Sequence, residues 1–203
     1  MNKMLKLAIL GVAACGVFAL TGCGGDKASS TAASSASGQG ALLQKIKKDG
    51  KLVVGTAPGF PPYEFLDTSV KDKKSITGID IKIAEAVAKK LGVKLEVQDM
   101  TFQSLLASIT TGKIDIAISA ITPTAEREKT VDFSDSYLVG KHTLLVRKED
   151  AGKYKTLSDF NGKKIAVQKS SLQEKLTNEQ IKDAQVVSLT KVPDALLELQ
   201  QGR

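Results

Sequence analysis

From residue 51 onward, the apolar residues recur in short runs that predict alternating strands and helices. Over residues 79–91 they follow a helical i, i+4 spacing, and Gly92 supplies a stop. The run over residues 114–119 is almost entirely apolar, as expected of a central parallel strand covered on both faces. The predicted order is strand 51–56, helix 79–91, strand 93–97, a helix capped by Ser104 and stopped at Gly112, and strand 114–119. This is a doubly wound α/β pattern.

A second set of α/β elements is predicted after a charged crossing segment that starts at residue 147 and follows a strand over residues 143–146. Its members are a short helix over 157–160, strand 164–167, a helix around 172–176, strand 186–189 and helix 193–201. Segments 104–113 and 194–203 match in their cap, apolar positions and terminal glycine, but a strand follows only the first. We therefore expect the sequence to be a fragment with an incomplete second unit.

The first 40 residues are predicted to be a targeting signal followed by a flexible tether. Lys3 and Lys6 precede an apolar run over residues 7–20 that is short for a membrane span. The run ends in Leu20-Thr21-Gly22-Cys23, which resembles the lipobox of bacterial lipoproteins. The resemblance implies cleavage before Cys23 and lipidation of that cysteine; a plain secretory signal or a membrane anchor is the alternative. Residues 24–40 are mainly Gly, Ser, Ala and Thr and are expected to form a flexible tether.

Charge and cysteine content narrow the class of protein. The chain has 203 residues and a formal net charge of +7, but its lysines are scattered and form no long basic block, so no nucleic-acid partner is expected. Cleavage would remove Lys3, Lys6 and Cys15 and lower the charge to +5. Cys23 would be the remaining cysteine, so no disulfide could form within the chain. No cofactor is expected, because the sequence shows neither a metal-ligand cluster nor a phosphate-binding loop.

The main candidate site is the stretch 116–128, where an apolar strand passes through small hydroxyl residues to Arg127. Thr122 or Thr124 can cap a helix, and Pro123 fits a cap or first-turn position. A strand that runs into a helix start presents free N–H groups at the edge of a sheet. Arginine binds a carboxylate through two parallel hydrogen bonds, so the stretch suits a carboxylate ligand. The alternative is a solvated arginine in a short surface helix.

The proline-rich loop over residues 57–65 is a second candidate site, because sites in open α/β sheets collect in loops after strands. Its prolines restrict the backbone and could hold an exposed Phe60 as a platform for a ligand. The alternative is that Phe60, Tyr63 and Phe65 pack the loop onto the domain. Packing is the favoured interpretation for Tyr63 and Phe65.

Six segments together carry a family resemblance: Gly55-Thr56, Pro62-Tyr63-Glu64-Phe65, Gly78-Ile79-Asp80-Ile81, Gly112-Lys113-Ile114-Asp115, Ile121-Thr122-Pro123-Thr124-Ala125-Glu126-Arg127 and Asp132-Phe133-Ser134. With them, Lys51 to Arg203 resembles the extracellular solute-binding proteins of amino-acid ABC transporters, which have the type II periplasmic-binding-protein fold. The resemblance implies two α/β lobes, each a mostly parallel sheet flanked by helices, that close on a ligand. Lobe 1 is expected over residues 41–146 and an incomplete lobe 2 over residues 147–203.

The resemblance also implies how the ligand is held. Arg127 would grip the ligand α-carboxylate, hydroxyl and backbone groups from both lobes would assist it, and two aromatic rings would flank the ligand side chain. The expected assisting groups are Ser119, Ala120 and Thr122 of lobe 1 and Ser170 and Ser171 of lobe 2, and the expected aromatic rings are Phe60 and Phe102.

Two residues depart from the family pattern, and one part of the family site is not in the sequence. Ala57 stands where some relatives that prefer basic ligands carry an acid, which weakens a case for lysine or arginine as ligand. Lys169 stands where many relatives carry glycine. The family's carboxylate for the ligand amino group would lie beyond Arg203.

The favoured function is capture of a free amino acid outside the cytoplasm and its delivery to an ABC permease. The protein would be a monomer held at the bacterial membrane by its lipid. An enzyme on the same fold, such as a dehydratase of a small carboxylate, is the first alternative, and a sensor's ligand-binding domain is the second. An enzyme is not expected: His142 is the single histidine and lies in a predicted crossing strand, and no nucleophile–base pair is apparent.

Overall fold

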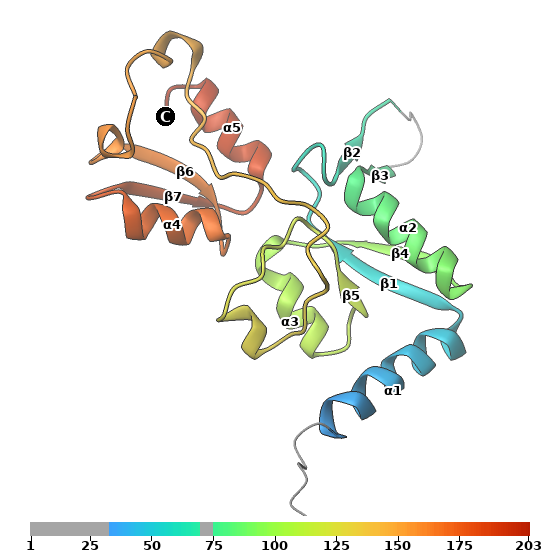
Figure 1. Ribbon diagram of the computed structural model, residues 1–203. Coiled ribbons are helices and arrows are strands. Elements are labelled where there is room, and N and C mark those ends of the chain that lie inside the picture. Colours follow the sequence, from blue (N-terminus) through green and yellow to red (C-terminus); the bar gives the residue numbers. More distant parts are fainter. Residues whose placement is uncertain (1–32, 70–74) are drawn as a thin grey trace, which may run out of the picture.

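The computed structural model describes residues 33–69 and 75–203, and it shows two α/β lobes joined by a long extended segment (Figure 1). The fold class expected from the sequence is confirmed. Cys23 and the predicted signal peptide lie outside the described residues. Within the described ranges, no helix combines the length and apolar character needed to cross a bilayer.

Lobe 1 is built on a three-stranded parallel sheet. Strand β1 (Lys51–Thr56) lies between β4 (Lys94–Asp99) and β5 (Ile116–Ala117). Val54 of β1 is in register with Val97 of β4 and Ile116 of β5. The central strand is therefore β1. The expectation of a central strand over residues 114–119 is wrong, because β5 pairs only with β1 among the described residues and its ladder is short.

Helices cover both faces of this sheet. Leu52 and Val54 point toward α1 (Ala33–Asp49) and α2 (Ile79–Leu91), where they share a core cluster with Ala84. Val53 points the other way and packs with Leu105 of α3 (Leu105–Thr110). This alternation within one strand is the period-2 pattern of a sheet that is buried on both faces.

Two helix boundaries can be compared with the sequence predictions. Helix α2 spans the predicted residues and ends at Gly92, whose φ of 72° is the left-handed conformation that glycine adopts readily. Ser104, in contrast, does not cap α3 with its side chain. It lies in a 3₁₀ turn over Phe102–Ser104, and its hydroxyl donates to the carbonyl of Thr101 at 2.8 Å. The same hydroxyl accepts from Thr101 Oγ1 at 3.0 Å, so the hydrogen bonds that it forms orient it toward the preceding turn.

Helix α1 extends into the segment predicted to be a flexible tether. Residues 33–40 are helical in the structure, so the tether prediction is wrong for them, and residues 24–32 lie outside the described part. Alanine favours helix, and the segment continues the helix anchored by the buried Ile46. The helix tolerates two glycines, Gly38 and Gly40, each at a cost of about 1 kcal/mol relative to alanine.

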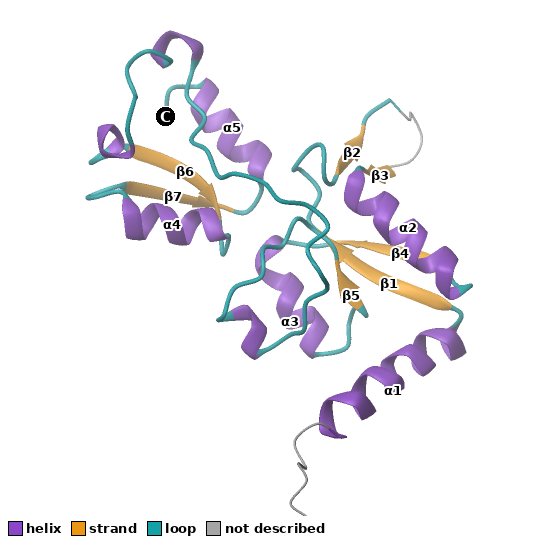
Figure 2. Cartoon of the chain, in the orientation of Figure 1, coloured by secondary structure: helices purple, strands orange, loops and turns teal. Residues whose placement is uncertain are grey.

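A hairpin of β2 (Phe65–Asp67) and β3 (Ser75–Thr77) lies beside the start of α2 (Figure 1). The connection from lobe 1 to lobe 2 carries no strand over residues 131–147 and is drawn as loop in Figure 2. The predicted strand at residues 143–146 is therefore wrong. No strand in the described part pairs with this segment, and apolar character alone does not satisfy backbone hydrogen bonds.

Lobe 2 has a two-stranded parallel sheet of β6 (Lys164–Gln168) and β7 (Gln185–Leu189). Helix α4 (Leu172–Gln180) connects these strands, and α5 (Val192–Gln200) follows β7. A 3₁₀ turn over Leu157–Phe160 precedes β6. The small core consists of Ile165, Val167 and Ile181, with Phe160 packed against it.

Gly78 is a position where only glycine fits. Its φ of 129° is disfavoured for other residues, and an added Cβ would lie 2.0 Å from the carbonyl oxygen of Tyr63. We expect Gly78→Ala to lower the free energy of unfolding by more than about 3 kcal/mol, measured by urea denaturation. Gly92→Ala is the control: its φ is also positive, but nothing lies within 4 Å of the added Cβ. It should cost only about 1–2 kcal/mol. Equal losses would contradict the steric argument.

Candidate functional site

A cavity of about 640 Å³ lies between the two lobes. Five of the eight ligand contacts expected from the sequence line it: Phe60, Phe102, Ser119, Ala120 and Ser171. They come from loops at the carboxyl ends of β1, β4, β5 and β6, where ligands bind in open α/β sheets. The structure thus gathers residues that are far apart in sequence around one cleft.

Arg127 joins the two lobes at the edge of this cleft. Its Nη1 donates to the carbonyl of Thr122 at 2.7 Å, and its Nη2 donates to the carbonyl of Ser170 in lobe 2 at 3.1 Å. Its guanidinium carbon lies 5.7 Å from the centre of the Phe102 ring, within cation–π range. These contacts bring together four of the predicted residues. Burial lowers the pKa of Arg127 from its usual value, but the guanidinium keeps its charge.

The turn that carries Arg127 is shorter than expected. A single 3₁₀ turn over Arg127–Lys129 replaces the predicted helix start, so the site has no sizeable helix dipole. Thr124 acts as a local cap: its Oγ1 accepts from the Arg127 N–H at 3.3 Å. The side chain of Arg127 is therefore the chemical feature that suits this turn to a carboxylate. Two of its five N–H donors bind protein carbonyls, which leaves three for a ligand.

Ser119 and Ala120 line the cavity, but their polar groups are engaged within lobe 1. The Ser119 hydroxyl donates to Glu64 Oε1 at 2.7 Å and accepts from the Ala57 N–H at 3.0 Å. The Ala120 N–H donates to Asp80 Oδ2 at 2.7 Å. In this conformation these two residues shape the turn, and the hydrogen bonds that they were expected to give a ligand are used internally.

The lobe 2 loop is held by Glu174, a residue that the sequence analysis did not single out. Ser170 has a left-handed φ of 63°, and its N–H donates to Glu174 Oε2 at 2.6 Å. The Ser171 hydroxyl caps α4 by accepting from the Glu174 N–H at 3.0 Å. Ser188 also donates to the Glu174 carboxylate. The spacing Ser171 to Glu174 is a capping-box signature that could have identified Glu174 from the sequence.

Phe60 lies at the cavity with its ring stacked on Tyr63, at a centroid distance of 5.2 Å. The stacking supports the packing interpretation for Tyr63, and the role of the half-buried Phe60 ring as a platform for a ligand stays a prediction. His142 is exposed and belongs to no strand, contrary to the expected place in a crossing strand.

Glu64 and Asp80 are two further residues that the sequence analysis missed as site components. Their side chains are buried behind the turn at Ser119 and Ala120, with 2% and 0% of their surface exposed. Burial and the neighbouring Asp80 carboxyl raise the pKa of Glu64 to about 8, although the Ser119 hydrogen bond opposes the shift. Glu64 could have been suspected from an acid between aromatic residues in a proline-rich loop.

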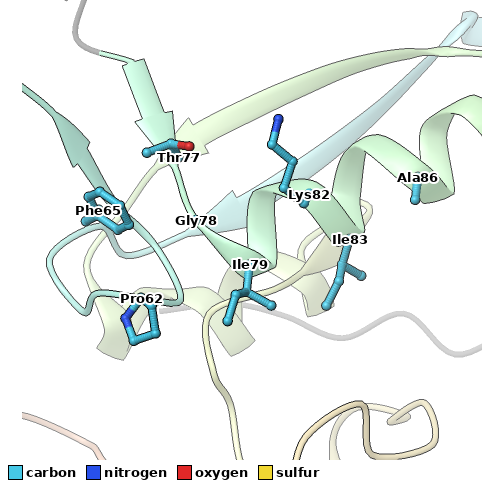
Figure 3. A pocket seen from close by; sticks show the side chains of 8 residues that line it. All are labelled: Pro62, Phe65, Thr77, Gly78, Ile79, Lys82, Ile83 and Ala86. Carbon is cyan, nitrogen blue, oxygen red and sulfur yellow. The ribbon is translucent and has the colours of Figure 1, made fainter. Parts of the chain in front are cut away.

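A second hollow of about 610 Å³ lies on the outer side of lobe 1, at the start of α2 (Figure 3). It is open and mostly apolar, and none of the expected ligand contacts lines it. Its walls are formed by Pro62, Phe65, Thr77, Gly78, Ile79, Lys82, Ile83 and Ala86. The cleft between the lobes is therefore the candidate ligand site. Among the described residues, no group of His, Cys, Asp and Glu is placed to hold a metal ion.

Two α/β lobes with an arginine between them define the class of two-lobed solute-binding proteins. A profile of bacterial extracellular solute-binding proteins, family 3, matches residues 52–201, and the chain belongs to this family.

Three proteins illustrate the similarity. The arginine-binding extracellular protein ArtP of Bacillus subtilis (strain 168) is 41% identical over 171 residues, which are 84% of this chain and 58% of ArtP. A Streptococcus pneumoniae Canada MDR_19A amino acid ABC transporter substrate-binding protein, solved bound to L-arginine, gives a TM-score of 0.77 at 43% identity. The match covers 79% of this chain and 67% of that one. The ancestral amino acid-binding protein AncCDT-1, a precursor of cyclohexadienyl dehydratase, gives 0.75 at 38% identity and covers 79% and 70%. The chain thus spans less than two thirds of the length of ArtP.

Proposed function

We propose that this protein binds a free amino acid between its lobes outside the cytoplasm and delivers it to an ABC permease. The observation that carries the proposal is that Arg127 bonds to both lobes and lies over the ring of Phe102. Phe102 lines the cavity, whereas Arg127 itself is not among the lining residues. A guanidinium with spare donors beside an aromatic ring suits an α-carboxylate. Closure of the lobes would be favoured by contacts that the ligand makes with both at once.

L-arginine is the first ligand to test, because ArtP and the S. pneumoniae protein are described by their arginine binding. Ala57 weakens the case for a basic ligand, because some relatives that prefer basic ligands carry an acid at this position; Ala57 itself is buried and does not line the cavity.

The test is a thermal-shift screen with the twenty amino acids and L-cystine. A ligand at 100 times its dissociation constant stabilises a binder by about 2.7 kcal/mol, which is a clear shift. We expect one amino acid or a small group to shift the melting temperature, and the D-enantiomer to do so weakly. Each compound is added at 10 mM, which is roughly 10 times a weak dissociation constant in the millimolar range. If no compound shifts the melting temperature, the result contradicts amino-acid binding.

We infer that the protein is a binding protein and not an enzyme. Dehydration of a carboxylate would need a proton donor in the cleft. Of the acidic residues that line it, Asp150 is paired with Arg147 and Lys153. Glu64 holds a proton more readily than a free carboxyl, because burial raises its pKa, but only 2% of its surface is exposed to reach a substrate. Slow turnover of a cyclohexadienyl carboxylate, lost in Glu64→Gln, would favour the enzyme alternative.

We expect Cys23 to carry the lipid that anchors the protein at the membrane. In cells fed radiolabelled palmitate, the wild-type protein should be labelled and found in the membrane fraction. Cys23→Ala should lose the label and remain at precursor size, because the thiol is the only lipid acceptor at the predicted cleavage site. Cys15→Ala is the control and should be processed normally. Labelling that persists in Cys23→Ala would contradict the lipobox interpretation.

A further inference from the structure

Two carboxyl groups without a basic partner lie buried behind the turn that leads to Arg127. Glu64 comes from the loop before β2, and Asp80 from the first turn of α2. In the described part of the chain, neither forms an ion pair with lysine or arginine, and Glu64 Oε2 has no hydrogen-bond partner. Two adjacent buried carboxylates repel each other strongly, so this arrangement favours retention of a proton.

Each carboxyl group holds one residue of the turn. Glu64 Oε1 accepts from the Ser119 hydroxyl, and Asp80 Oδ2 accepts from the Ala120 N–H, each at 2.7 Å. Ala120 has a φ of 48°, a left-handed conformation that is unfavourable for alanine. Such a conformation persists only where surrounding contacts fix it, and these two hydrogen bonds are contacts of that kind.

The turn is connected to Arg127 through Thr122. It leads within two residues to Thr122, whose carbonyl accepts from Arg127 Nη1. We propose that Glu64 and Asp80 act together as positioning residues for Arg127, and that the turn is held fully only while the pair keeps a proton. For its effect on ligand affinity, this inference rests on the proposed function.

Among the described residues, no basic side chain bonds to either carboxyl group of the pair. The remaining titratable group at the pair is Tyr137, whose hydroxyl donates to Asp80 Oδ1 at 3.0 Å; burial and Asp80 raise the pKa of this hydroxyl. Across the cavity, the charged residues that line it from lobe 2 bond to neither carboxyl group of the pair. They are Arg147, Asp150, Lys163, Lys164 and Arg203.

The direction of the pH dependence of the turn follows from the raised pKa of Glu64, which is about 8 when the turn is formed. Opening the turn would expose Glu64 and return its pKa to about 4.5. The open turn should therefore become about tenfold more populated for each pH unit between roughly 5 and 8, and level off above that.

Hydrogen exchange of the Ala120 amide in the ligand-free protein between pH 5 and 9 measures the opening of the turn. The Val54 amide is the reference for global unfolding. The wild-type protection factor should fall about tenfold per pH unit from about pH 5 until the open turn predominates, and then level off near one. Glu64→Gln should remove this slope, because the amide cannot ionise. Glu85→Gln, an exposed carboxyl on the same helix as Asp80, should follow the wild type.

The same three proteins are then titrated with L-arginine at pH 6 and pH 9. Between pH 6 and pH 9, the affinity of the wild type should fall roughly tenfold more than that of Glu64→Gln. Because both proteins bind the same ligand, this comparison removes the effect of titrating the ligand ammonium group. Equal slopes at Ala120 in wild type and Glu64→Gln would overturn the inference, and an unchanged affinity ratio would overturn the link to Arg127.

If L-arginine binds none of the proteins but the slope is present, the positioning pair stands and arginine binding fails. If Glu64→Gln does not fold, Asp80→Asn should move the step to lower pH, and a step that stays in place would overturn the pairing.

Discussion

Replacing Arg127 by alanine is expected to weaken amino-acid binding by about 2–5 kcal/mol, or roughly 30- to 5,000-fold in the dissociation constant. The guanidinium supplies charge-assisted hydrogen bonds in a half-buried site, and its loss would also remove the contact with the Ser170 carbonyl of lobe 2. Calorimetric titration with the amino acid found in the screen measures the change.

Two matched variants sharpen this prediction. Arg127→Lys keeps the charge but loses the fork geometry, and should recover only part of the affinity. Lys129→Ala removes an exposed cation from the same 3₁₀ turn and should bind almost normally. If Arg127→Ala bound as tightly as Lys129→Ala, Arg127 would be a structural link between the lobes and not a ligand contact.

The stability of the protein is expected to depend on pH through Glu64. The pKa of this side chain is about 8 in the folded state and about 4.5 as a free group. The folded state therefore holds a proton that the unfolded state releases above pH 4.5. This contribution is fully present below about pH 4.5, declines by about 1.4 kcal/mol per pH unit, and is lost once the pH has passed about 8.

Glu64→Gln isolates this effect, because its amide has no proton to lose while other groups titrate alike in both proteins. The difference in free energy of unfolding should be small at pH 4.5 and should grow by up to about 1.4 kcal/mol per pH unit toward pH 8, with the variant the more stable. Urea denaturation at several pH values gives the difference. A difference that does not change with pH would show that Glu64 is ionised in the folded protein.

Much of the local structure follows from the sequence alone. Helix α2, strands β1 and β4 and the elements of lobe 2 lie close to their predicted bounds, because each has a clear apolar period and a glycine, serine or proline at a boundary. The cap at Ser171 and the stop at Gly92 also follow from local chemistry. The motif around Arg127 drew attention to a residue that contacts both lobes in the structure, and its predicted role toward a ligand carboxylate stays a prediction.

What the sequence left undecided depends on contacts between distant segments. The strand predicted at residues 143–146 does not form, because a strand requires a partner that no local pattern supplies. The pairing of Glu64 with Ser119 and of Asp80 with Ala120 joins residues 40 to 55 positions apart. Local sequence specifies where a helix or strand can form. Only the packed lobes decide which buried carboxyl groups meet, what proton they hold, and which polar groups face the cleft.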